Sequence, residues 1–182
     1  MIEYIAYHGT NSEHVESIKI NGFESSSSLN EWLGSGVYFF VEGFSCPIEN
    51  ARDWAKNTAF KNKYVSYSIL KTLVTGDRVL DLRLEEDLKL FDSLRKHIFE
   101  RYEAEKEILG KKLHPDTFLC NSVAKSMKLD ILIQNLYIKT KYQRINHIES
   151  RMPNTTVLCA KESANIELVN IEEIEKGVIE NE

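Results

Sequence analysis

The sequence predicts an α+β fold with a mixed, mainly antiparallel sheet, and three observations lead to this prediction. Segments with period-two alternation, typical of strands, are interspersed with segments whose apolar residues recur every three or four positions, typical of helices. These segments follow one another as strand, helix, strand, helix, two strands, helices and final strands. The 182 residues suffice for one domain that buries most of its apolar surface.

The first half of the chain contains three predicted strands and two predicted helices. The strands comprise residues 2–7, 36–41 and 64–74. Asn11 or Ser12 caps the first helix and Gly22 ends it. The second helix begins at Pro47 and continues to about Phe60. Between them, residues 25–32 form a polar loop.

The second half begins with a short strand at residues 78–82, followed by a helix over residues 84–109. Pro115 opens a further helix that extends to about Met127. The pattern of residues 130–138 fits a strand or a buried helix equally well. Residues 155–161 and 165–171 are predicted as final strands.

Composition limits the class of protein. Apolar residues make up 42% and charged residues 28%, which is typical of a soluble globular chain. No stretch reaches the roughly 20 apolar residues of a membrane span, and MIEYIAYHGT lacks the features of a secretory signal. Cys46, Cys120 and Cys159 are odd in number and lack metal-ligand spacing. We therefore expect a cytoplasmic protein without disulfides, structural metal or a membrane partner.

Charge is distributed unevenly over the chain. Residues 95–144 hold eleven Lys and Arg against six acids, a local charge of +5, within a chain of net charge −5. Residues 162–182 hold seven Glu against one Lys, a local charge of −6. The basic segment could attract a polyanion. The alternative is a solvated helix face followed by an acidic tail, which the scattered placement of the basic residues favours.

Several common catalytic motifs are absent from the sequence. The segment GSGVYF is not a dinucleotide fingerprint, because its glycines open a strand and Phe39 takes the third glycine position. Gly110-Lys111 lacks the earlier glycine and the Ser or Thr of a phosphate-binding loop, and no HExxH occurs. Nothing supports a cysteine nucleophile, and each cysteine fits a small buried apolar side chain.

Polar and aromatic residues at three early positions remain as a candidate site. His8-Gly9-Thr10 ends the first strand, Tyr38 lies in the second strand after a glycine turn, and Trp54 lies on the next helix. Taken singly, each has an ordinary structural explanation: a strand-end histidine or a core aromatic residue. Their occurrence together and in this order favours a binding site.

These residues belong to segments that resemble the ADP-ribosyltransferase family. The segments are YHGT, GF, LGSGVYFF and ARDWA, and they are similar to the diphtheria-toxin-like branch that includes the poly(ADP-ribose) polymerases. That branch carries an H-G-[ST] strand end, a G-x-G-[IV]-Y-F strand and an aromatic residue on the following helix. The similarity covers residues 4–60. It implies a split mixed sheet with flanking helices, in one catalytic domain with a helical insertion at about residues 84–127.

The resemblance also implies NAD as co-substrate and a role for each residue. His8 would hydrogen-bond a ribose hydroxyl, and the backbone of Gly9 would hold the nicotinamide carboxamide, which a residue without Cβ permits. Tyr38 and Trp54 would stack on the two faces of the nicotinamide ring. Thr10 would support the carboxamide or the ribose. The ring would thus leave from a fixed position as positive charge develops on the sugar.

The family places a glutamate early in a late strand, where it stabilises that charge. Here residues 155–157 read Thr-Thr-Val, so Thr155 takes the catalytic position. Gln143, Glu149 and Glu162 are other polar candidates, the two glutamates requiring a shift of register. The missing glutamate makes extension to a polymer improbable and favours the transfer of a single ADP-ribose.

We therefore expect an NAD-dependent mono-ADP-ribosyltransferase that acts on a macromolecule, either protein or nucleic acid. A small catalytic domain of this kind is similar to bacterial toxins of toxin–antitoxin or phage-defence systems, so an antitoxin protein is a possible partner. An NAD glycohydrolase, with water as acceptor, is a close variant. The alternative is a non-catalytic module that binds NAD or ADP-ribose, which the missing glutamate favours.

Overall fold

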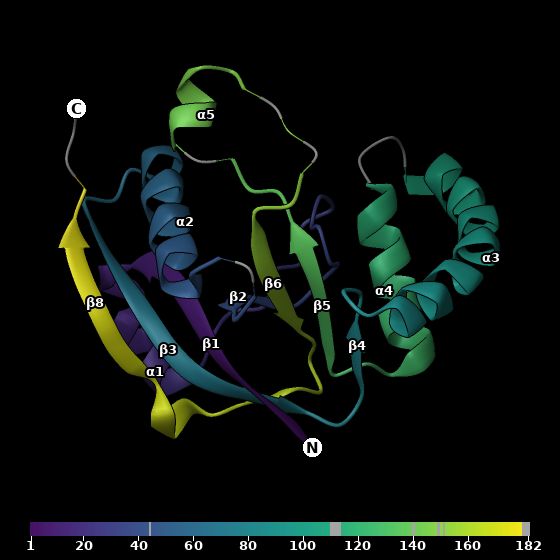
Figure 1. The fold of residues 1–182 in the computed structure, drawn as a ribbon, viewed down its shortest axis with the longest axis horizontal. Helices are drawn as coiled ribbons and strands as arrows, with labels where there is room; N and C mark the ends of the chain where they lie inside the picture. Colours follow the sequence, from purple (N-terminus) through teal and green to yellow (C-terminus); the bar gives the residue numbers. More distant parts are fainter. Residues whose placement is uncertain (44, 110–113, 140, 149, 151, 180–182) are drawn as a thin grey trace.

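The computed structural model shows an α+β protein whose centre is an eight-stranded mixed sheet (Figure 1). It describes residues 1–43, 45–109, 114–139, 141–148, 150 and 152–179, with residues 60, 61, 103–109, 141 and 142 described by their backbone alone. The strand order is β4-β5-β6-β2-β1-β3-β7, and β8 also pairs with β3. The strands are β1 (Ile2–Asn11), β2 (Val37–Val41), β3 (Ser66–Gly76), β4 (Val79–Asp81), β5 (Ile131–Leu136), β6 (Thr155–Ala160), β7 (Asn165–Ile166) and β8 (Glu172–Val178).

The pairing confirms the predicted mixed, mainly antiparallel sheet. β4 and β5 are parallel, whereas the other registered pairs are antiparallel. The helices are α1 (Val15–Asn21), α2 (Pro47–Asn62), α3 (Glu85–Leu109), α4 (Pro115–Met127) and α5 (Lys141–Ile145), with 3-10 turns η1 (Ser12–His14) and η2 (Leu168–Asn170). α2 lies over β1 and β3, and α1 lies behind them (Figure 1). Among the described residues, none of the helices combines the length and apolar character needed to cross a bilayer.

Two apolar clusters lie on opposite faces of the sheet because side chains alternate along each strand. Tyr38 and Phe40 of β2 belong to the cluster that packs under α2, α3 and α4. We call this side of the sheet the α2 face. Phe39, between them, belongs to the second cluster, together with Ala6 of β1. We call that side the opposite face. Because of this alternation, the side chain of each strand residue lies either on the α2 face or on the opposite face.

Helix α2 begins and packs as its sequence predicts. Pro47 occupies the first turn, where its missing N–H costs nothing. Ala51, Ala55 and Ala59 recur every four residues and are almost fully buried. Their small side chains let the helix backbone approach β1 closely. α2 thus holds a fixed position over the end of β1.

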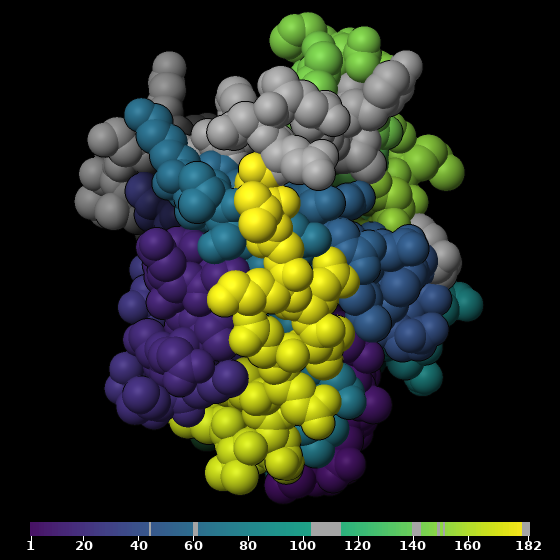
Figure 2. All heavy atoms as spheres, turned by 90° about the vertical axis from the view of Figure 1, so that its left-hand side faces the viewer, coloured from purple at the N-terminus to yellow at the C-terminus, as the bar shows by residue number. Residues whose placement is uncertain are grey.

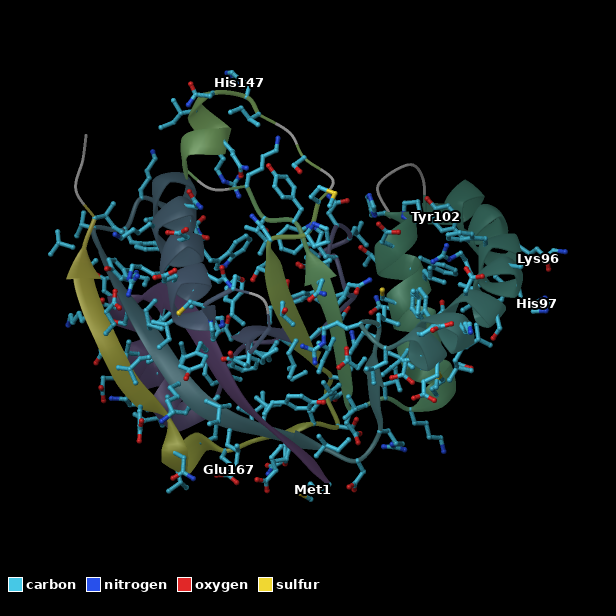
Figure 3. All side chains as sticks on the ribbon, viewed as in Figure 1. Met1, Lys96, His97, Tyr102, His147 and Glu167 are labelled. Atoms are coloured by element: carbon cyan, nitrogen blue, oxygen red, sulfur yellow. The ribbon has the colours of Figure 1, made fainter. Side chains whose placement is uncertain are left out.

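α3 and α4 lie at residues where helices were predicted, and they pack on each other beside β4 (Figure 1). Tyr102 joins them, with its ring 5.4 Å from that of Phe118 and 6.4 Å from that of Phe99. Lys96 and His97 project from α3 away from the rest of the molecule (Figure 3).

The ambiguity at residues 130–138 is resolved as a strand, since Ile131, Leu132 and Ile133 of β5 are fully buried between β4 and β6. The predicted strand at residues 165–171 is largely wrong. Only β7 and the turn η2 lie there, and the longer strand β8 follows at residues that the pattern did not indicate. Helix α5 was also not predicted.

β8 is stabilised by its partners rather than by its own apolar pattern. It crosses the face shown in Figure 2, between the N-terminal segment and α2. Glu175 of β8 accepts two hydrogen bonds of 2.6 Å from Arg52 of α2 and one of 2.9 Å from Tyr67 of β3. Glu173 accepts a hydrogen bond of 2.6 Å from the buried Ser68. These contacts lie far apart in the sequence, so the local pattern could not reveal them.

Candidate functional site

The pairing between β1 and β2 ends where the predicted site residues begin. The last registered pair between them is Tyr7 with Phe40. From His8 onward β1 remains paired with β3, while the other side of β2 is paired with β6. A hydrogen bond of 2.9 Å crosses this break in the ladder, from Nδ1 of His8 to the carbonyl oxygen of Tyr38. A side chain thus replaces the next backbone pair.

His8 is enclosed by aromatic rings on the opposite face. Its ring centroid lies 5.1 Å from that of Phe23 and 5.8 Å from that of Phe39, both edge-on. Burial lowers the pKa of His8, although its bond to the Tyr38 carbonyl opposes this effect. The imidazole is therefore neutral near pH 7, with its proton on Nδ1 and an acceptor lone pair on Nε2.

Gly9 is required for the packing of α2. A Cβ at this position would lie 2.0 Å from the carbonyl oxygen of Ala51 and 3.0 Å from Cβ of Ala55. We expected the backbone of Gly9 to lie close to a ligand; in the structure it lies close to helix α2. Thr10, next along β1, is buried at 9% exposure and is registered with Ser68 of β3.

Tyr38 closes the turn that precedes its own strand. Its hydroxyl donates to the carbonyl oxygen of Gly34 at 2.6 Å and accepts from the amide of Leu33 at 2.9 Å. Burial raises the pKa of this phenol well above its usual range, so it stays protonated. A phenylalanine could not make either bond, which explains why a phenol stands in this apolar strand.

Trp54 lies on α2 and packs on the same cluster as Tyr38. Its ring meets that of Trp32 edge-on, at 5.6 Å and 66°. Tyr38 and Trp54 thus share the α2 face, whereas the ring of His8 lies on the opposite face. The expected convergence of all three side chains on one ligand is therefore wrong for the imidazole. Successive side chains of a strand point to opposite sides of the sheet, and His8 lies on the side of Phe39, not on that of Tyr38.

A small polar cavity lies between α2 and the start of β6. Its volume is about 30 Å³, which is the space of one water molecule. The lining residues are Phe40, Asn50, Asp53, Asn57, Ile138, Lys139, Asn154 and Thr155. A group the size of nicotinamide would require the cavity to open.

Thr155 is the only one of the six predicted site residues among those that line this cavity. It is 2% exposed, and its hydroxyl has no hydrogen-bond partner among the described residues. Buried hydroxyls nearly always have a partner. Since the cavity lies beside Thr155, a water molecule or a ligand hydroxyl there could supply the missing hydrogen bond. The late-strand position predicted as catalytic is therefore at a place where a polar group could bind.

Sequence reasoning missed the polar stripe of α2. Asn50, Asp53 and Asn57 recur at helical spacing and line the cavity together. Asn50 donates to Ser45 at 2.8 Å and Asn57 to the carbonyl oxygen of Lys139 at 3.3 Å, which fixes both amides. The spacing i, i+3, i+7 of these three polar residues could have revealed the stripe beside the apolar alanine stripe.

Asp53 supplies a carboxylate to the lining of the cavity. The residue is exposed, and partial desolvation raises its pKa, although Lys56 and Arg52 oppose this shift. No hydrogen bond or ion pair to its carboxylate is found among the described residues. A carboxylate of this kind can accept a proton or stabilise a nearby positive charge.

The other polar candidates lie elsewhere. Glu162 follows β6 at the end away from Thr155 and lines a different cavity. Gln143 lies on α5, and its carbonyl oxygen accepts from the amide of Ile148 at 2.9 Å. Glu149 lies outside the described residues. Among the residues that the structure describes, no group of three or more His, Cys, Asp or Glu could hold a metal ion.

Comparison of the chain with protein-family models, with curated proteins and with solved structures finds no match in any of the three.

Proposed function

We propose that the chain is an NAD-dependent mono-ADP-ribosyltransferase with the split sheet of that family. The observation that carries the proposal is the break in pairing between β1 and β2, bridged by the bond from His8 to the Tyr38 carbonyl. It falls between the two motifs on which the resemblance rests. The strand order supports the same proposal, since β6, with Thr155 at its start, lies directly beside β2.

In this proposal the bond between the nicotinamide nitrogen and C1′ of the ribose breaks, and nicotinamide leaves with the bonding electrons. The sugar carries the resulting positive charge until an acceptor nucleophile attacks C1′. Asp53 takes the place of the missing late-strand glutamate: its carboxylate stabilises the cation and accepts the proton of the nucleophile. Thr155 positions a ribose hydroxyl through its unpartnered Oγ1.

The acceptor in this proposal is a macromolecule, either protein or nucleic acid. The resemblance, in which the late-strand glutamate is missing, implies the transfer of a single ADP-ribose. We further propose that the protein acts in the cytoplasm as a bacterial toxin of a toxin–antitoxin or phage-defence system, with an antitoxin protein as partner. With water as acceptor, the same steps give an NAD glycohydrolase.

A non-catalytic module that binds NAD or ADP-ribose is the second candidate. Two observations favour it. Both hydrogen bonds of the Tyr38 hydroxyl are made to its own turn, and the cavity beside Thr155 has the volume of a single water molecule. Such a protein would bind the dinucleotide after opening but would not break it.

Nicotinamide release distinguishes the two. The wild-type protein is incubated with NAD labelled on the nicotinamide ring, with and without a cell extract as a source of acceptors, and free nicotinamide is measured by chromatography. Loss of a positioned acid–base group lowers rates by roughly 100-fold or more, so Asp53→Asn should release nicotinamide at about 1% of the wild-type rate. Thr155→Val, which removes the hydroxyl and keeps the shape, should also slow release.

The matched control is Glu49→Gln, which neutralises an exposed carboxylate one turn earlier on α2 and should leave the rate unchanged. Binding of NAD without release by the wild type would establish the non-catalytic candidate. Neither release nor binding would refute both. Equal nicotinamide release by the wild type and Asp53→Asn would support the enzymatic proposal but reject Asp53 as the acid–base group.

A further inference from the structure

A second cavity, a hollow widely open to solvent, lies at the opposite end of β6 from Thr155, and no residue lines both. It has a volume of about 380 Å³ and is formed where the turn after β3, the end of α4 and the turn after β6 meet. We call it the basic cavity. Its ionisable lining residues are Arg78, Lys125, Lys128, Lys161 and Glu162. The lining thus holds four cations against one acid, with the carboxylate of Asp130 paired to Arg78 beneath them, in a chain whose net charge is −5.

The floor of the basic cavity is held in place by Asp130. This buried carboxylate accepts from the backbone amide of Arg78 at 2.9 Å, from its guanidinium at 3.0 Å and from the hydroxyl of Ser163 at 2.6 Å. These bonds join the turn after β3 to the turn after β6, two of the three segments that form the cavity. Arg78 is thus fixed through one part of its guanidinium, and its side chain remains about half exposed.

Lys161 adds charge but no free donor. Its ammonium group donates to the carbonyl oxygens of Leu33 at 2.6 Å and Ser35 at 2.9 Å, and lies 3.3 Å from the sulfur of Cys159. Contact with a ligand therefore falls to Arg78, Lys125 and Lys128.

Lys125 and Lys128 are exposed, and among the described residues neither forms an ion pair. They lie three residues apart, at the end of α4, with Lys128 in the left-handed conformation that caps the helix (φ 52°). Three cationic groups from two separate elements thus face one concave surface. Such a surface attracts phosphate groups, whose charge and acceptor oxygens match lysine and arginine.

The chemistry of the walls narrows the ligand further. The remaining wall residues are Ala124, Leu129 and Ser163, and the hydroxyl of Ser163 is bonded to Asp130. The lining therefore offers no aromatic ring on which a base could stack and no free amide that could read a base edge. It can bind a phosphate but cannot select a particular small nucleotide.

The position of the acidic residues supports a polyanion. Glu172, Glu173 and Glu175 lie on β8, at the edge of the sheet away from β4 and α4 (Figure 1). A polyanion that approaches the β4 and α4 side therefore meets the basic cavity, with these acids far away. We propose that the basic cavity binds phosphate groups of a nucleic-acid backbone. This inference does not depend on turnover of NAD.

The test is fluorescence anisotropy of a labelled single-stranded oligonucleotide, of mixed sequence, titrated with the full chain at several salt concentrations. The variant Lys125→Ala/Lys128→Ala removes the two free ammonium groups. We expect at least a tenfold weaker Kd, and a slope of log K against log salt that is smaller by about 1.4, since each phosphate contact contributes roughly 0.7 for single strands.

The matched control is Lys96→Ala/Lys176→Ala, which removes the same charge from exposed lysines on α3 and β8. It should bind like the wild type. Equal losses in both variants would overturn the proposal in favour of non-specific attraction, as would the absence of oligonucleotide binding at low salt. If adenosine monophosphate binds as tightly as the oligonucleotide, the ligand is a single nucleotide and the proposed strand is rejected. Polyglutamate that competes equally well would reject phosphate as the recognised group.

Discussion

Replacing Tyr38 by phenylalanine removes one oxygen atom and keeps the aromatic ring. The two hydrogen bonds of that oxygen are lost together: the amide of Leu33 loses its partner, and the carbonyl of Gly34 keeps only a long contact of 3.8 Å from the thiol of Cys159. Both of these residues are buried, with Leu33 at 2% exposure. The variant therefore tests whether the phenol holds the turn before β2, separately from any stacking by its ring.

The expected cost follows from the two groups left behind. A hydrogen bond contributes about 1 kcal/mol net, and a buried polar group without a partner costs about 1–3 kcal/mol. Two such groups give a loss of roughly 2–6 kcal/mol in the free energy of unfolding. In a domain of this size each kcal/mol lowers Tm by about 2–4 °C, so Tm should fall by about 4–24 °C.

Urea denaturation followed by circular dichroism measures this loss. The matched control is Tyr64→Phe, which removes a hydroxyl with one hydrogen bond, of 2.5 Å, to the carbonyl oxygen of Ala55. The control should lose about half as much stability or less. If Tyr38→Phe is no less stable than Tyr64→Phe, the phenol does not hold the turn, and the structural explanation for its presence fails.

Two further predictions concern the dependence of stability on pH. Because burial lowers the pKa of His8, the unfolded chain binds a proton that the folded protein does not, so stability is lost as pH falls below about 6.5. Urea midpoints should show this loss in the wild type and in the control His97→Asn, which replaces an exposed histidine, but not in His8→Asn. Burial alone would raise the pKa of Asp130, but hydrogen bonds from Ser163, Arg78 and Asp77 hold it well below its usual range. The stability that this carboxylate contributes to the fold is therefore complete above about pH 4 and is lost as pH falls further. Asp130→Asn should be less stable at pH 7, and its stability should decline less steeply in acid than that of the wild type. An equally steep decline in both proteins would contradict this assignment.

The results of the two tests can be combined. If the chain transfers ADP-ribose and the basic cavity binds nucleic acid, nucleic acid becomes the favoured acceptor. If only the basic cavity is supported, the protein is a nucleic-acid-binding chain whose small polar cavity has another use. Each result therefore stands without the other.

The local pattern predicted the elements whose partners are apolar and regular. α4 has its predicted bounds because Pro115 begins it, and its buried face repeats at helical spacing. β8 was missed because its residues alternate poorly and its acids accept hydrogen bonds from Arg52 and Ser68, which are distant in sequence. Strand pairing of this kind depends on tertiary partners more than on intrinsic preference.

For the site, the sequence by itself determined which residue types are present and in which order: a strand-end histidine, a phenol after a glycine turn, and a late strand that begins with threonine. It could not determine on which side of the sheet each would lie. The tertiary structure decided that the imidazole of His8 and the ring of Tyr38 are separated by the sheet, and that Asp53 and Thr155 share a cavity. The physical reason is that side-chain direction alternates along a strand, while the strand and helix that meet at a cavity are chosen by packing across the whole chain.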